Sequence, residues 1–256
     1  MDSRVKERFA RLWTRYFGGA ELPVTFFYSD SASLKAIRPP VRPPEGHHCV
    51  ISDITRVRRG KSLAFDVDSF GCGGGQRYFG YPSALMPDFE YFLSTGIPGK
   101  VEGERYKKSP ELVREAVVNM PVFKAPGRFT VFKRWDALGE TDQPEVVIFF
   151  GPPDVLSGVF TLFNFDEAQS DRVICPFAAG CASIVQYPYL ETNSEVPQAV
   201  LGMFDVSARP CVPMNVLSFA IPMKRFERMI DNMEESFLTT GSWAKIRRRI
   251  GSAQKR

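Results

Sequence analysis

Hydrophobic residues recur at helical spacing in several stretches of this 256-residue chain. The first stretch begins after the capping candidates Asp2 and Ser3 and ends at Gly18-Gly19, which favour the end of a helix. Pro222 opens the last such stretch, an amphipathic helix. The same spacing predicts further helices over residues 49–57, 87–93, 110–118, 154–164 and 178–186, with a short one over 78–81.

Short apolar runs bounded by glycine or proline predict strands between these helices. Residues 145–150 form the strongest such run, and Gly151-Pro152-Pro153 ends it. Residues 63–70 instead alternate between apolar and polar, as expected for a strand with one polar face. Further strands are expected over 22–28, 172–174, 199–205 and 216–221. The interleaving of strands with helices predicts a mixed α/β fold.

Two segments share one order of elements: helix, strand, glycine and cysteine, short helix, then an aromatic residue before proline. They span residues 49–81 and 154–189, and their equivalent points are Gly71-Cys72 and Gly180-Cys181. This order predicts two pseudo-repeated halves, related by a local two-fold that brings Cys72 and Cys181 together. We therefore expect a single globular domain over residues 1–240, with halves of about 20–120 and 121–240.

The formal charge of +4 comes from the C-terminal end of the chain. Residues 241–256 contain six Lys and Arg residues and no acid, which leaves −2 for residues 1–240. We expect this basic tail to be disordered beyond about Trp243 and solvated, rather than to bind nucleic acid.

The N-terminus lacks the apolar core of a signal peptide, and no run of about eighteen apolar residues occurs. The chain has five cysteines, an odd number that favours reduced thiols over a disulfide framework. These features predict a cytoplasmic protein without a membrane span. They indicate no oligomeric state.

Four motifs occur along most of the chain after the first helix: His48-Cys49, Ser69 to Gly74, the Val146 to Pro153 strand with its Gly-Pro stop, and Gly180 to Ser183. Together they resemble the domain of unknown function 169 family, which is mainly bacterial and archaeal. That family has no settled activity, so the resemblance implies no reaction. The proline-rich loop from Arg38 to Gly46 and the basic tail look like elaborations of this member.

The leading hypothesis is a cysteine-centred site that binds zinc or an iron–sulfur cluster. Cys49, Cys72 and Cys181 match the family-like positions, and His48 lies beside Cys49. Three thiolates with an imidazole suit either group. Against this, the chain has no Cys-x-x-Cys pair, and buried unreactive cysteine is the alternative.

A second hypothesis makes Cys72 the reactive thiolate of an enzyme. Lowering a cysteine pKa from about 8.5 to about 7 requires roughly 2 kcal/mol, whereas an exposed helix N-terminus supplies only about 0.3 to 1 kcal/mol. Arg77 would have to supply the remainder by folding over the thiol. Slow alkylation of Cys72 at neutral pH would contradict this hypothesis.

A third hypothesis is a binding module for a small anionic ligand. Backbone N–H groups of Gly73, Gly74 and Gly75 would approach a carboxylate or phosphate, and Arg77 would bind it through two hydrogen bonds. The alternative is a flexible turn that glycine permits. The sequence contains no dinucleotide-binding, phosphate-loop, zinc-protease or Gly-x-Ser-x-Gly motif. The sequence therefore does not decide whether the protein is an enzyme.

Overall fold

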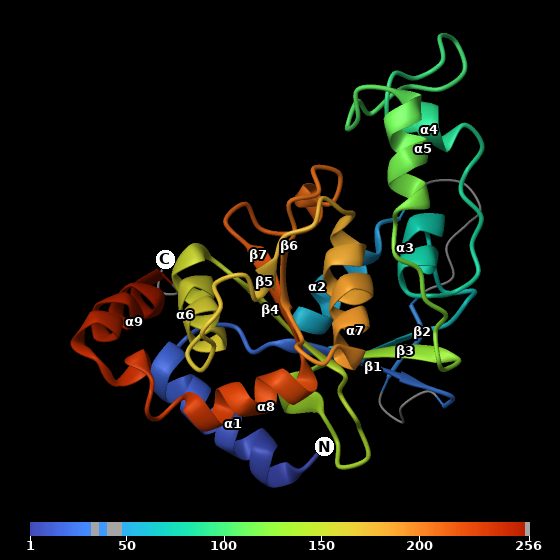
Figure 1. Cartoon of the computed structure of the whole chain (residues 1–256). Helices are drawn as coiled ribbons and strands as arrows, with labels where there is room; N and C mark the ends of the chain where they lie inside the picture. The colour runs from blue at the N-terminus through green and yellow to red at the C-terminus, as the bar shows by residue number, and fades with distance from the viewer. Residues whose placement is uncertain (32–35, 40–47, 254–256) are drawn as a thin grey trace.

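One mixed sheet runs through the molecule (Figure 1). The computed structural model describes residues 1–31, 36–39 and 48–253, and within them the strand order is β2-β3-β1-β4-β7-β6-β5. Neighbouring strands are antiparallel except for the parallel pair β5 and β6. The predicted mixed α/β fold is therefore confirmed. The strands are β1 (Val24–Ser29), β2 (Leu63–Phe65), β3 (Phe129–Arg134), β4 (Val146–Gly151), β5 (Val173–Ile174), β6 (Ala199–Gly202) and β7 (Leu217–Pro222).

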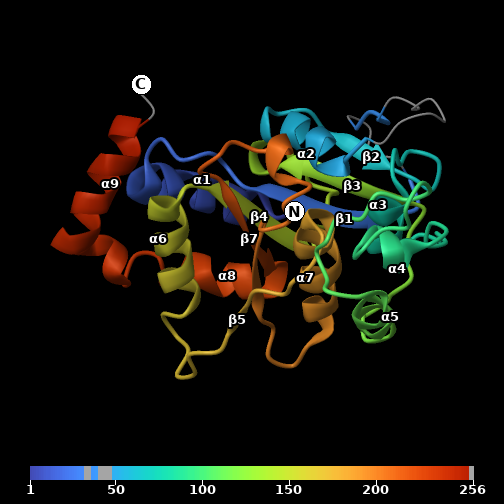
Figure 2. The same cartoon turned by 90° about the horizontal axis from the view of Figure 1, so that it is seen from above.

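Helices cover both faces of the sheet (Figures 1 and 2). One face packs against α1 (Ser3–Phe17), α6 (Pro153–Phe163), α8 (Met223–Asn232) and α9 (Gly241–Ala253). The other packs against α2 (Val50–Arg58), α3 (Gly73–Tyr78), the π-helical turn η2 (Ala182–Gln186) and α7 (Tyr187–Leu190). Helices α4 (Phe89–Phe92) and α5 (Pro110–Val118) contact each other and stand away from the sheet as an arm, at the upper right of Figure 1. Short 3-10 turns are η1 (Trp135–Ala137), η3 (Glu191–Asn193), η4 (Arg209–Cys211) and η5 (Phe237–Thr239).

Strand β4 shows why the sheet needs both layers. Val147 and Phe149 belong to the core beneath α1 and α8, whereas Val146, Ile148 and Phe150 belong to the core beneath α2 and η2. Successive side chains of a strand point to opposite faces, so an uninterrupted apolar run is stable only when both faces are covered. This explains why residues 145–150 gave the strongest strand signal.

Strand β3 was not predicted, although it pairs with both β1 and β2. Its polar positions hide the pattern, because they are buried with partners from distant segments. Thr130 shares a hydrogen bond of 3.1 Å with the Tyr81 hydroxyl, and Lys133 donates to Asp142 at 2.6 Å. Buried polar groups are tolerated only when paired in this way.

Most predicted helices are confirmed within a few residues. Helix α1 begins where Asp2 accepts a hydrogen bond from the Arg4 N–H at 2.8 Å, and it ends before Gly18-Gly19. Strand β2, in contrast, ends at Phe65 instead of residue 70, because the Ser69 N–H donates to the Asp66 carbonyl and closes a turn. The short helix predicted over 78–81 begins earlier, at Gly73.

The pseudo-repeat is not confirmed. Helices α2 and α6, which the repeat makes equivalent, lie on opposite faces of the sheet. A two-fold axis perpendicular to the sheet would keep them on the same face. The two glycine–cysteine junctions nevertheless lie on one face, because α3 and η2 pack against each other there.

The expectation of disorder beyond about Trp243 was wrong for residues 241–253, which form α9. Trp243 and Ile250 are buried against α1 and α6, and the Trp243 indole donates to the Tyr16 carbonyl at 2.8 Å. Arg249 pairs with Asp154 at 3.0 Å. The apolar residues between the basic ones thus anchor the segment. Residues 40–47, which include most of the proline-rich loop, and 254–256 lie outside the described residues.

Candidate functional site

The three predicted site cysteines lie at the starts of helical segments. Cys49 and Cys72 are extended and immediately precede α2 and α3, whereas Cys181 is already helical and leads directly into η2. Cys181 is buried, and the other two are partly buried. A fourth cysteine, Cys211, ends the 3-10 turn η4 and is also partly buried. Sequence reasoning missed Cys211 because it has no glycine neighbour and no helix follows it directly.

The four thiols interact with one another, and we call them the cysteine cluster. Cys49 interacts electrostatically with both Cys211 and Cys72. Cys181 in turn interacts electrostatically with both Cys72 and Cys49. The fold therefore brings together cysteines from four separate segments. Cys175 has no part in these interactions and is exposed.

Two thiols of the cluster, Cys49 and Cys181, have raised pKa values. Burial, together with the neighbouring Cys211 and Cys72, raises the pKa of Cys49 from 9.0 to about 12. Burial likewise holds the pKa of Cys181 well above its usual value, with added repulsion from Cys72 and Cys49. Both thiols are consequently protonated at neutral pH.

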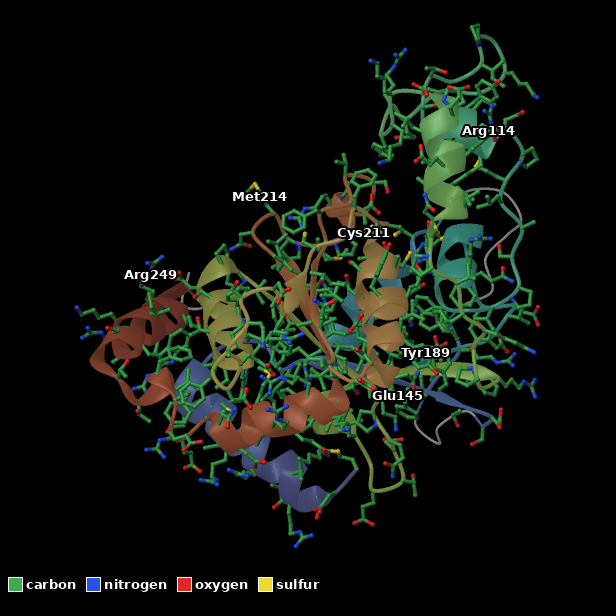
Figure 3. The ribbon with its side chains drawn as sticks, viewed as in Figure 1. Arg114, Glu145, Tyr189, Cys211, Met214 and Arg249 are labelled. Atoms are coloured by element: carbon green, nitrogen blue, oxygen red, sulfur yellow. The ribbon has the colours of Figure 1, made fainter. Side chains whose placement is uncertain are left out.

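One face of α2 holds Cys211 in place. The Ser52 hydroxyl donates to the Cys211 sulfur at 3.2 Å, and the Thr55 hydroxyl donates to the Cys211 carbonyl at 3.1 Å. Residues 49, 52 and 55 follow one another at a spacing of three, which places them on the same side of the helix start. Helix α2 therefore binds both the main chain and the side chain of Cys211 (Figure 3 labels this residue).

In the glycine-rich loop, the lack of a side chain at Gly75 allows α3 to pack closely against α2. The Gly75 N–H donates to the Cys72 sulfur at 3.2 Å. A Cβ atom at Gly75 would lie 3.1 Å from that sulfur and 3.5 Å from the Val50 Cβ, so a larger residue would press α3 away from α2. Gly73 and Gly74 are exposed. Because Cys72 already takes the Gly75 N–H, the predicted anion cradle has one donor fewer.

Arg77 is partly buried, and its Nε atom has no hydrogen-bond partner among the described residues. Its charge acts on the neighbouring Tyr78, lowering a phenol pKa that burial raises to about 12. Arg77 is not among the groups that influence Cys49 or Cys181.

His48 lies beside the cysteine cluster and is held by two contacts. Its Nε2 atom is 3.1 Å from the Asp53 carboxylate, and its backbone N–H donates to the Gly71 carbonyl at 3.1 Å. Asp53 is buried and also faces Arg56 at 3.5 Å. The His48 nitrogen predicted as a ligand candidate is thus engaged by a carboxylate. The backbone bond ties the start of α2 to the loop that carries Cys72.

The loop that leads to Cys181 and the loop that carries Cys211 both expose apolar side chains. Asp205 accepts a hydrogen bond from the Gly180 N–H at 2.8 Å, which ties the loop after β6 to the Cys181 junction. Phe177 is 76% exposed, and the Lys107 ammonium lies 4.4 Å from its ring centroid. Met214, in the same loop as Cys211, projects outward and is 94% exposed (Figure 3).

Within the part of the chain that the structure describes, no group of three or more His, Cys, Asp or Glu side chains is arranged so that it could hold a metal ion. A surface hollow of about 290 Å³ is lined by residues that include Tyr81, Lys124 and Arg128 but none of the cysteines. Asp66, at its edge, is buried and paired with Arg38.

Comparison with known proteins places the chain in a family without assigning it a reaction. Among the described helices, none combines the length and apolar character that a membrane span requires. No match was found among the curated proteins or among the solved structures. The family model described as DUF169, "Uncharacterised ArCR", matches residues 17–232, a range that includes the whole cysteine cluster. The resemblance carried by its motifs is thus confirmed, and the chain belongs to the domain of unknown function 169 family.

Proposed function

We propose that the protein binds an iron–sulfur cluster through Cys49, Cys72, Cys181 and Cys211. The observation that carries the proposal is the convergence of these four thiols from separate segments onto one face of the sheet. Four thiolates are the usual ligand set of [2Fe–2S] and [4Fe–4S] clusters. Cys211 supplies the fourth thiolate in place of His48, whose Nε2 is bound to Asp53.

A cluster demands less convergence of the four thiols than a single zinc ion does. Zinc–sulfur bonds of about 2.3 Å in a tetrahedron place the four sulfurs only about 3.8 Å apart. In a cubane cluster each thiolate binds a different iron, so the ligands stand farther apart. Among the described residues no group of three or more His, Cys, Asp or Glu side chains could hold a metal ion as it stands, so binding requires the four thiols to move towards the cluster.

The protonated thiols of Cys49 and Cys181 imply that metal binding at this site would be coupled to the release of protons. Ligand thiols must be deprotonated, and both Cys49 and Cys181 have raised pKa values in the metal-free protein. Binding therefore releases protons, and affinity rises with pH through the neutral range. A bound cluster would supply the positive charge that the cysteine cluster itself lacks.

Anaerobic purification followed by an absorption spectrum and by iron and sulfide analysis tests the proposal. We expect brown protein with stoichiometric iron and sulfide. Cys72→Ser and Cys211→Ser should lose most of the iron, whereas Cys175→Ser, which alters an exposed cysteine outside the cluster, should retain it. Protein that stays colourless and free of iron after anaerobic reconstitution with iron and sulfide would overturn the proposal.

A thiol-dependent enzyme using Cys72 is the second candidate, favoured by the hydrogen bond from the Gly75 N–H to the Cys72 sulfur. This bond fixes the sulfur at the start of α3, where Cys72 is partly buried rather than sealed in the core. Faster alkylation of Cys72 than of Cys175 at neutral pH, in protein without iron, would support this candidate. Alkylation of Cys72 slower than that of Cys175 would eliminate it.

A further inference from the structure

The surface hollow of about 290 Å³, whose lining contains none of the cysteines, has the form of a small-molecule site. It lies beyond the last residue pair of β2 and β3, Phe65 with Thr130. Its lining residues come from three walls: residues 66–68 after β2, 80–82 after α3 and 124–128 before β3. Small-molecule sites have volumes of roughly 300–1,000 Å³, so this hollow suits a small metabolite.

Hydrogen bonds hold the walls of the hollow together. The Ala125 N–H donates to the Gly80 carbonyl at 2.8 Å. Only glycine permits this approach, because Gly80 has a φ of 80° and a Cβ there would lie 2.6 Å from the Ala125 nitrogen. The buried Tyr81 hydroxyl lies 3.1 Å from both the Arg128 carbonyl and the Thr130 hydroxyl. The hollow is therefore built into the fold by bonds between its walls.

Opposite charges line the hollow from different walls. Asp68 belongs to the first wall, Lys124 and Arg128 belong to the third, and all three residues are exposed. The second lining acid, Asp66, is buried and already paired with Arg38. Among the residues that the structure describes, Asp68, Lys124 and Arg128 form no ion pair. Their charges are thus available to a ligand.

The side chain of Arg128 is held in place without losing its hydrogen-bonding edge. Its guanidinium carbon lies 5.1 Å from the centroid of the Phe129 ring, and its backbone N–H donates to the Asp30 carboxylate at 3.2 Å. A guanidinium that packs over an aromatic ring keeps its N–H groups free in the plane of the group. Arg128 can therefore bind a carboxylate through two parallel hydrogen bonds.

We propose that this hollow binds a small zwitterion of the amino-acid type. Lys124 and Arg128 bind the carboxylate of the ligand, and Asp68 binds its ammonium group. The opposite charges of the two walls stay apart across the hollow instead of pairing directly, and a ligand that carries both charges bridges them. The proposal does not depend on the cysteine cluster.

The charge of the lining favours a zwitterion over a simple anion or a simple cation. A simple anion would be attracted by Lys124 and Arg128 but would leave Asp68 without a partner and be repelled by it. A simple cation would meet the reverse arrangement. An amino acid satisfies both walls, and such complementarity of charge determines which ligand is selected.

Isothermal titration calorimetry of the full-length chain with the common L-α-amino acids tests the proposal. We expect at least one amino acid to bind at a one-to-one ratio. Two analogues of that amino acid complete the test: the carboxylic acid that lacks its amino group, and the amine that lacks its carboxyl group. Each should bind about tenfold more weakly, because each leaves one wall without its charged partner.

Three variants distinguish the two ends of the ligand. Lys124→Ala and Arg128→Ala should each weaken binding of the amino acid and of its carboxylic acid analogue several-fold. Asp68→Asn should weaken binding of the amino acid several-fold but should not weaken binding of the carboxylic acid. Lys245→Ala and Asp171→Asn, which alter exposed residues outside the hollow, should bind as wild type. Circular dichroism establishes that each variant is folded.

Three results would overturn the inference. The first is that none of the amino acids binds. The second is equal binding of the amino acid and its carboxylic acid analogue, which would make the hollow a site for simple anions. The third is an affinity that is unchanged in Lys124→Ala, Arg128→Ala and Asp68→Asn. The cysteines take no part in these measurements, so failure here and failure of the proposed iron–sulfur cluster can be told apart.

Discussion

Alkylation of Cys49 should be much slower in the folded protein than in the unfolded chain. Burial raises the pKa of this thiol from 9.0 to about 12, a difference of about three units. Each unit changes the thiolate fraction about tenfold at neutral pH, so the folded protein holds about 1,000-fold less thiolate at Cys49. A more basic thiolate is also a better nucleophile, and a Brønsted coefficient of about 0.4–0.5 returns roughly 20-fold of this loss. The net expectation is alkylation about 50-fold slower, before any steric shielding.

The measurement uses iodoacetamide at pH 7.5 under anaerobic conditions with a chelator, and peptide mass spectrometry follows each cysteine separately. The same protein in urea supplies the unfolded rate for Cys49, so that one residue serves as its own control. Exposed Cys175 should differ much less between the two states. The pH dependence adds a second test: the unfolded rate should level off above about pH 9, whereas the folded rate should still be rising at pH 10. Equal rates for Cys49 in the two states at pH 7.5 would refute the argument from burial.

Three further predictions concern stability, each measured by thermal or denaturant unfolding. Trp243→Ala should cost about 3–5 kcal/mol, because the buried indole anchors α9 on α1 and α6; a loss below about 1 kcal/mol would show that α9 is not docked. Gly158→Ala should destabilise by about 1–3 kcal/mol, since a Cβ there would lie 2.3 Å from the Trp243 ring, and the loss should shrink in a Trp243→Ala background, where only the Phe17 ring at 2.8 Å still opposes the Cβ. Burial disfavours the charge on Asp166, but hydrogen bonds from Arg225 and Asn232 prevail and lower its pKa from 3.8 to about 2. Its stabilisation is thus complete above about pH 4 and lost as the pH falls towards 2; Asp166→Asn should flatten this part of the stability curve, and an unchanged curve would contradict the assignment.

Local patterns predicted most of the elements correctly. Helix α5 follows its capping residue Ser109, whose side chain accepts from the Leu112 N–H, and covers the residues that periodicity indicated. Strand β4 is apolar on both sides because both faces of the sheet are covered. In each case the signal lies within one short segment, where hydrophobic spacing and capping residues act directly.

Two elements were not predicted because their stability depends on partner residues in distant segments of the chain. Strand β3 contains Lys133, which is buried only because Asp142 neutralises it. Helix α9 looked like a charged tail because its docking depends on Trp243 meeting a glycine of α6, Gly158. Neither partner is visible from the segment itself, so propensity and charge counts gave the wrong answer.

The cysteine cluster shows the same division between sequence and structure. The sequence by itself indicated, from apolar spacing and glycine, that helices begin at about Cys49 and Cys181 and that Cys72 stands at a junction between a strand and a helix. Only the tertiary structure decided which thiols meet. Long-range strand pairing places β7 beside β4 and β6 beside β7, and the loop between β6 and β7 then carries Cys211 to α2. Contacts between residues so far apart in the chain depend on the whole sheet, and no local pattern records them.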